Sequence, residues 1–232
     1  MKRMGHVCLL AALTVLSAAG QTRKMSQGAN RMELTLERYD GSNWKIMDPG
    51  MVFASGDRIR FRFRTNFSGF LYVMNQGTGG SYTQLFPTED AGLQNRVEAD
   101  KEYYVPATTD GSFKIAGPAG HDVVYWMVTP AAIGGTHKST ALPPPPPLDS
   151  TPPPTMTPRC DDAILRARGD CVDSNAGAKP VARGQDLPAN LQKANPGSSQ
   201  ELVFMKSQNR SVVTAQSRLT GPVVFEYRLA HK

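Results

Sequence analysis

The sequence lacks any motif that defines a catalytic, cofactor or metal site. No serine lies in a G-x-S-x-G nucleophile elbow. Glycines are concentrated at 77–80, but no Lys followed by Ser or Thr comes after them, which favours a hairpin loop over a phosphate-binding loop. Asp170, Asp173 and Asn175 have the wrong spacing for a calcium loop, and its closing glutamate is missing. We therefore expect no cofactor and no bound metal.

Long hydrophobic runs are also missing. The apolar run at 7–16 is much shorter than the roughly 20 residues that span a bilayer as a helix. It follows Lys2 and Arg3 and precedes small residues at 17–20, which is the order of a cleavable signal peptide. We predict that residues 1–20 are removed on export to the periplasm or the extracellular space. The mature protein is then expected to have no stable membrane span.

Cysteine is scarce, with three in the chain. Cys8 lies inside the apolar run and not directly after it, so a lipid anchor is not expected. Cys160 and Cys171 remain as a pair, and in an exported protein we favour a disulfide over two free thiols. A zinc site is less favoured, because no histidine lies nearby to complete it. Residues 161–168 resemble a short helix that Gly169 ends, and the bridge allows only a turn or two of helix before the chain returns through Gly169 and Asp170.

Positively charged residues are only mildly in excess over negatively charged ones. The formal net charge is +6, and loss of Lys2 and Arg3 gives +6 − 2 = +4 for the mature chain. This balance permits contact with an anionic polymer of the bacterial envelope. It falls short of a nucleic-acid-binding signature, so no nucleic-acid partner is expected.

Helical periodicity is missing over most of the chain, and period-two alternation replaces it. Ile59, Phe61 and Phe63 alternate with arginines over 58–64, which predicts a half-buried strand with a basic outer face. The uninterrupted apolar run at 70–74 suits a strand covered on both sides. Further candidate strands are 32–37, 44–47, 82–86, 103–105, 113–115, 123–128, 201–205 and 223–229. Short strands without intervening helices predict an all-β antiparallel sandwich, immunoglobulin-like in general architecture.

Proline interrupts this pattern at 143–147 and 152–154, where it favours polyproline II structure. The segment acts either as a stiff spacer or as a ligand for a partner's aromatic groove. The predicted organisation is a signal peptide (1–20), a flexible segment (21–31), the first part of the sandwich (32–133), a proline-rich insertion with the Cys160–Cys171 loop (134–199), and the last strands (200–232).

A series of short motifs resembles the bacterial family called domain of unknown function 4384. The motifs are G-D-R-I-R-F at 56–61, G-F-L-Y-V at 69–73, Q-L-F-P at 84–87 with Asn95, Y-V-P at 104–106, and G-P-A-G at 117–120. The resemblance implies a small β-sandwich found behind signal peptides or attached to larger bacterial proteins, including caspase-like peptidases and kinases. It implies an accessory or interaction module and transfers no catalytic residue.

Arginines on strand faces are the candidate binding residues: Arg58, Arg60, Arg62, Arg64 and Arg228. Guanidinium groups spaced about 7 Å apart along a strand can meet the phosphates or carboxylates of an anionic polymer. The alternative, which we favour, is a solvated face balanced by cross-strand glutamates such as Glu33, Glu37 and Glu226.

Aromatic residues suggest a sugar-binding platform as a second possibility. The candidates are Trp44, Tyr72, Tyr82, Tyr103 and Trp126. Most of them lie in strand patterns, so core packing between the two sheets is favoured.

Enzymatic chemistry has one weak candidate. His121 and Asp122 are adjacent, but neighbours in a strand point to opposite faces, which argues against a dyad with a serine. We therefore expect an exported, non-catalytic β-sandwich that binds an envelope protein or an anionic envelope polymer. A secreted hydrolase with an unrecognised site and a purely structural envelope component are the alternatives.

Overall fold

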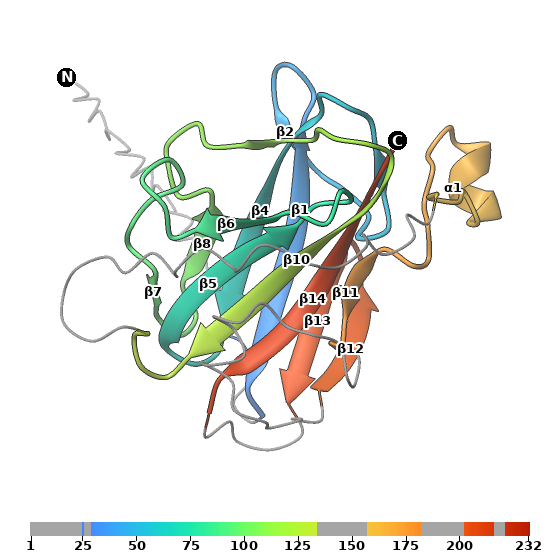
Figure 1. The fold of residues 1–232 in the computed structure, drawn as a ribbon. Coiled ribbons are helices and arrows are strands. Elements are labelled where there is room, and N and C mark those ends of the chain that lie inside the picture. Colours follow the sequence, from blue (N-terminus) through green and yellow to red (C-terminus); the bar gives the residue numbers. More distant parts are fainter. Residues whose placement is uncertain (1–24, 26–28, 134–156, 182–201, 216–220) are drawn as a thin grey trace, which may run out of the picture.

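A computed structural model describes residues 25, 29–133, 157–181, 202–215 and 221–232. Its strands form two seven-stranded sheets that face each other (Figure 1). The first sheet has the order β12-β13-β1-β4-β8, with β2 beside β1 and β9 beside β4. Its strands are β1 (Arg31–Tyr39), β2 (Trp44–Ile46), β4 (Arg58–Thr65), β8 (Glu102–Val105), β9 (Phe113–Lys114), β12 (Leu202–Ser207) and β13 (Arg210–Ala215).

The second sheet has the order β11-β14-β10-β5-β6, and two short strands lie outside this path. Its strands are β3 (Val52–Phe53), β5 (Gly69–Gln76), β6 (Tyr82–Phe86), β7 (Arg96–Val97), β10 (Gly120–Thr129), β11 (Gly177–Lys179) and β14 (Val223–His231). Within the described ranges, every strand pair is antiparallel except β3 with β14. The predicted all-β sandwich is confirmed.

Large aromatic side chains fill the space between the sheets. Trp126 of β10 is completely buried, and its ring centroid lies 5.2 Å from that of Phe61 and 5.5 Å from that of Phe63. Phe225 of β14 stacks on the same indole at 6.5 Å. The alternation predicted for β4 is confirmed, because Ile59, Phe61 and Phe63 point into this core.

The second sheet also has an apolar outer face. Tyr72, Met74, Tyr125 and Met127 are buried there, against partly buried side chains that include Val181. Leu71 and Val73, by contrast, belong to the core between the sheets. The prediction that the strand at 70–74 is covered on both sides is therefore confirmed.

The C-terminal part contributes three strands, where the sequence pattern predicted two. The missed strand β13 lies between β12 and β1 and pairs antiparallel with both. Val212 and Val213 are both buried although they point to opposite faces, so the segment shows no alternation. Strands β3 and β7 have two residues each, too few to show any period. Strand β11 lies within the range predicted as insertion, at the edge of the second sheet beside β14.

The cysteine pair forms the predicted disulfide, with the Cα atoms of Cys160 and Cys171 4.7 Å apart. The helix between them, α1 (Ala163–Ala167), has five residues, which agrees with the turn or two predicted within 161–168. Asp162 caps its N-terminus by accepting hydrogen bonds from the amides of Ile164 and Leu165. Gly169 then reverses the chain with a φ of +85°, as the disulfide requires.

The predicted signal peptide at 1–20 and the two proline runs at 143–147 and 152–154 lie outside the described residues. Among the residues that are described, no helix has the length and hydrophobicity needed to cross a membrane.

Candidate binding site on the outer face of the first sheet

The predicted row of arginines lies on the outer face of the first sheet. Arg60, Arg62 and Arg64 of β4 are half-buried and Arg58 is exposed, while the residues between them are buried. On β1 the same alternation turns Glu33, Thr35 and Glu37 outward, next to the arginines of β4. The face therefore sets the arginines of β4 beside the glutamates of β1.

Side chains from three other strands of the sheet hold Arg60 in place. Its Nε donates a 2.7 Å hydrogen bond to Glu37 Oε2 on β1, directly opposite in the register. Its guanidinium carbon lies 4.2 Å from the ring centroid of Trp44 on β2 and 4.4 Å from that of Tyr104 on β8. We call Trp44, Arg60 and Tyr104 the arginine clamp. Cation–π contacts to two rings fix a guanidinium that a lone surface arginine would leave mobile.

Tyr104 is the exposed member of the clamp, with 37% of its surface accessible. Its hydroxyl donates to Glu102 Oε1 at 3.3 Å. Partial burial, followed by the neighbouring Glu102 carboxylate, raises the pKa of this hydroxyl above its usual value. The side chain therefore offers partners a neutral ring edge and a hydroxyl at physiological pH.

Ion pairs neutralise most of the face. Glu37 is 5% exposed and also lies 3.4 Å from Arg62, which in turn reaches Glu102 at 3.7 Å. Six ion pairs on this face involve five arginines and four carboxylates, a formal sum of +5 − 4 = +1; their members are Arg31, Arg60, Arg62, Arg64, Arg210, Glu33, Glu37, Asp100 and Glu102. The cross-strand glutamates Glu33 and Glu37 thus have arginine partners.

Arg58 has a different environment from its neighbours in the row. Its Nε donates to Ser112 Oγ at 3.0 Å, and its guanidinium lies 5.0 Å from the ring of Tyr39. Tyr39 in turn packs 5.4 Å from Trp44, which continues the aromatic surface along β1 and β2.

Arg228 does not join the row. It lies on β14 in the second sheet, where its Nε donates to Glu226 Oε1 at 2.7 Å. The sequence pattern placed Arg228 on an outward face, and the residue is half-buried there. The pattern could not show which of the two sheets would contain its strand.

Next to the clamp the face is hollowed. An open cavity of about 410 Å³ is lined mainly by Glu33, Ile46, Arg62, Arg64, Glu102 and Arg210. Ile46 is 46% exposed, so the cavity joins an apolar rim to charged walls. This combination offers a partner both an apolar contact and charged hydrogen-bonding groups.

His121 and Asp122 belong to two separate clusters on opposite faces of β10. His121 Nε2 lies 3.0 Å from Asp173 Oδ2. Asp122 accepts from the amide and the hydroxyl of Thr78, at 2.7 and 2.9 Å, and lies 3.3 Å from His231 Nε2. Sequence reasoning missed Thr78 and His231, because nothing in the sequence indicates that positions so far apart would meet.

The cluster of Thr78, Asp122 and His231 contains the residue types of a hydrolase triad in a different geometry. The Thr78 hydroxyl and the Asp122 carboxylate both contact the same nitrogen of His231, Nε2. A triad needs the carboxylate on the other ring nitrogen. Thr78 and His231 are also buried, so the arrangement ties a loop to the end of β14.

The lowered pKa of Asp122 predicts that the stability of the protein depends on pH. Burial pushes its pKa upward, but hydrogen bonds from His231 and Thr78 outweigh this and hold the pKa below its usual value. A carboxyl with a lowered folded pKa adds stability above its unfolded pKa of about 3.9, and this is lost as the pH falls through the folded value. Asp122→Asn should therefore be less stable than wild type at pH 7, and the gap should shrink below about pH 4. Urea unfolding at several pH values measures the difference in unfolding free energy between the two proteins. A difference that does not change with pH would contradict a lowered pKa of Asp122.

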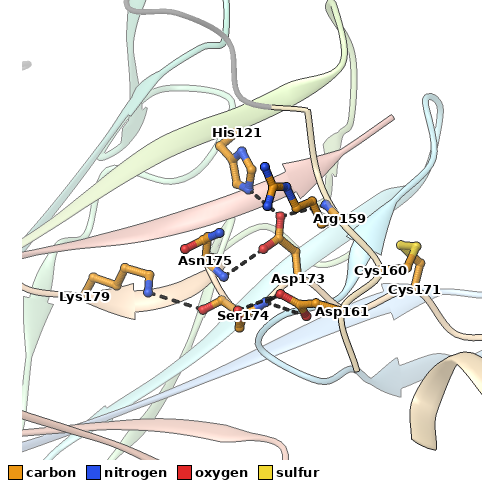
Figure 2. Close-up of polar contacts among 9 residues, drawn as sticks. All are labelled: His121, Arg159, Cys160, Asp161, Cys171, Asp173, Ser174, Asn175 and Lys179. Atoms are coloured by element: carbon orange, nitrogen blue, oxygen red, sulfur yellow. Dashed lines mark hydrogen bonds and ion pairs between the residues drawn. A yellow bond between two sulfur atoms is a disulfide. The ribbon is translucent and has the colours of Figure 1, made fainter. Parts of the chain in front are cut away.

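The cluster of His121 and Asp173 anchors the disulfide loop (Figure 2). Asp173 is fully buried and accepts hydrogen bonds from the amides of Arg159 and Asn175 besides its contact with His121. Burial raises its pKa, but these hydrogen bonds and the charge of His121 more than compensate, so the pKa lies below its usual value. Asp173 and Asn175, two members of the imperfect calcium pattern, are thus engaged within the chain. No group of three metal-ligating side chains occurs in the described part of the chain.

The aromatic residues considered for sugar binding are distributed over several environments. Trp126 and Tyr72 are buried, Tyr103 packs partly against the core, and Tyr82 packs partly against the outer cluster of the second sheet. Trp44 lies half-buried in the arginine clamp. The structure therefore does not bring these rings together on one exposed platform.

These observations define an all-β sandwich with an arginine- and aromatic-rich face on one sheet. Residues 52–132 match the family described as domain of unknown function (DUF4384), which confirms the resemblance seen in the sequence. The matched part contains β4 and β8, hence Arg60 and Tyr104, whereas Trp44 and Glu37 precede it. Comparisons with curated proteins and with solved structures gave no match.

Proposed function

We propose that this protein is an exported, non-catalytic binding module of the bacterial envelope, and that the outer face of its first sheet binds a protein partner. The arginine clamp is the observation that carries the proposal. Tryptophan, tyrosine and arginine are the residues that most often dominate the energy of protein interfaces. Here Trp44, Arg60 and Tyr104 form one fixed cluster at the surface.

The rigidity of the clamp supports a role in binding. Ordering a long side chain at an interface costs about 0.5–1.5 kcal/mol. Arg60 has already lost that freedom, because two rings and the Glu37 carboxylate hold it before any partner arrives. A partner that contacts this face therefore gains charged and aromatic contacts at low entropic cost.

The charge of the face favours a protein over an anionic polymer. Polymer binding by arginine requires guanidinium groups that can exchange counterions for polymer charges. The ion-paired groups of this face sum to only +1, since Glu33, Glu37, Asp100 and Glu102 are the acceptors, and Arg58 brings the total to +1 + 1 = +2. A mixed surface of paired charges with exposed Tyr104 and Ile46 suits the rim and centre of a protein interface.

Removing the exposed apolar groups tests the face with little risk to the fold. We expect the double variant Tyr104→Ser with Ile46→Ser to lose at least about tenfold of the cross-linked partner recovered from intact cells, since each interface anchor contributes more than about 1 kcal/mol. Leu93→Ser is the matched control, because Leu93 is 44% exposed and lies between β6 and β7 in the second sheet. Equal losses in both proteins would contradict the proposal.

The anionic-polymer alternative predicts a different result. Retention on immobilised anionic envelope polysaccharide would then fall steeply with salt and be abolished by Arg62→Ser with Arg64→Ser. Both residues line the cavity beside the clamp. Our proposal expects weak retention that these substitutions leave unchanged.

A further inference from the structure

The disulfide loop at 160–171 stands apart from the sandwich. Helix α1 projects to one side of the two sheets, near the C-terminus (Figure 1). The helix has no buried residue, and Ile164 is 70% exposed. Helix α1 therefore contributes no side chain to the core, although the Cys160–Cys171 disulfide closes the loop that contains it.

The base of the loop is firmly attached to the second sheet. The amide of Val52 in β3 donates to the carbonyl of Cys171 at 2.8 Å, and the amide of Asp161 donates to Val172 at 3.1 Å. Asp161 also accepts from the hydroxyl and the amide of Ser174, which lowers the pKa of its carboxyl (Figure 2). The loop is thus held in one conformation by a disulfide and by hydrogen bonds on both sides of it.

The end of α1 displays the sequence Arg168, Gly169, Asp170. Its backbone is fixed: the amide of Gly169 donates to Arg166 at 3.0 Å and that of Asp170 to Leu165 at 3.0 Å. Gly169 has a φ of +85°, which a residue with a side chain adopts only with strain.

The two charged side chains of this tripeptide differ from most arginines and acids of the molecule. Arg168 and Asp170 are exposed, and within the described residues neither side chain makes an ion pair or hydrogen bond. Arg60, Arg62 and Arg64, in contrast, all pair with carboxylates. A rigid turn therefore presents a guanidinium and a carboxylate on either side of a glycine, both available to a partner.

We propose that this loop is a recognition site for a protein receptor that binds the Arg-Gly-Asp sequence. The receptor chemistry that fits is a carboxylate-lined pocket for the Arg168 guanidinium and a bound divalent cation for the Asp170 carboxylate. The glycine between them leaves room for close approach. Closure of the loop by Cys160 and Cys171 lowers the entropy that a receptor must remove.

This inference rests on the proposed export, because a receptor of this kind meets the protein only outside the cytoplasm. It uses a surface separate from the face of the first sheet. The variant Tyr104→Ser with Ile46→Ser should therefore keep full receptor binding, which makes failure of the two proposals distinguishable.

The test measures binding of the purified full-length secreted protein, with its disulfide intact, to the immobilised ectodomain of an Arg-Gly-Asp-binding integrin in Mn²⁺ buffer. We expect saturable binding that chelation of Mn²⁺ abolishes. Asp170→Glu keeps the charge but moves the carboxylate by one methylene, and should weaken binding at least about thirtyfold. Arg166→Lys, an exposed change in the same loop outside the tripeptide, should have no effect.

Opening the loop gives a second measurement. Cys160→Ser with Cys171→Ser should weaken binding about tenfold, because the tripeptide loses its fixed conformation. Absence of wild-type binding, or equal binding by wild type and Asp170→Glu, would overturn the proposal. Unfolding curves verify that these variants remain folded, which is expected since Asp170 is exposed.

Discussion

Trp126→Ala is expected to destabilise the protein by about 3–5 kcal/mol, the largest effect of any substitution proposed for this chain. The indole lies between the two sheets and contacts Phe61, Phe63 and Phe225. Its removal leaves a cavity that rings on opposite sheets cannot close without moving the sheets. Since whole domains are stable by about 5–15 kcal/mol, the variant should be close to unfolding at physiological temperature.

Urea unfolding with the disulfide intact measures this effect. Trp44→Ala is the matched control, since it removes the same side chain from the outer face of the first sheet. That change should cost about 1 kcal/mol, the value of an exposed cation–π contact. Trp126→Phe, which keeps most of the ring, provides a variant that folds if Trp126→Ala does not. Equal destabilisation by Trp126→Ala and Trp44→Ala would contradict the position of Trp126 in the core between the two sheets.

Arg60→Met is expected to lower the stability by roughly 1.5–3 kcal/mol and to abolish partner binding. Methionine keeps the apolar stem between Trp44 and Tyr104 but removes the charged donor to Glu37 Oε2. Glu37 is nearly buried, so its carboxylate is left with Arg62 alone at 3.4 Å. A buried carboxylate that loses a charged partner pays most of its desolvation cost.

Arg58→Met is the control for this prediction. Arg58 contacts the neutral hydroxyl of Ser112 and the ring of Tyr39, so its loss should cost less than about 1 kcal/mol. Urea unfolding gives the stability of each variant, and cross-linking in intact cells gives partner binding. If Arg58→Met proved as harmful as Arg60→Met in both assays, the clamp would have no special role.

The sequence was sufficient to predict elements whose residues carry their own period or turn signal. Strand β4 alternates arginine with apolar residues, and this alone indicated both its buried side and its basic side. The short helix and its return through Gly169 followed from the distance limit of the Cys160–Cys171 bridge. Strand β13 was missed because Val212 and Val213 are both buried, which removes the period from the sequence.

The candidate site was less accessible to sequence reasoning, because it depends on how strands are paired. The sequence predicted short strands at 44–47 and 103–105, but it could not show that Trp44 and Tyr104 would lie on either side of Arg60. Those positions follow from β2 and β8 joining the sheet on opposite sides of the β1 and β4 pair. The placement of Arg228 in the other sheet has the same origin.

Photo-cross-linking in intact cells from position 104 shows most directly whether the outer face of the first sheet binds a protein. Tyr104→benzoylphenylalanine places the reactive group on the exposed member of the clamp, and Leu93→benzoylphenylalanine places it on a comparably exposed loop of the second sheet. We expect one dominant protein adduct from position 104, absent from position 93 and lost when Arg60→Met is added. No adduct from position 104, or the same adducts from both positions, would contradict the claim that this face binds a protein partner.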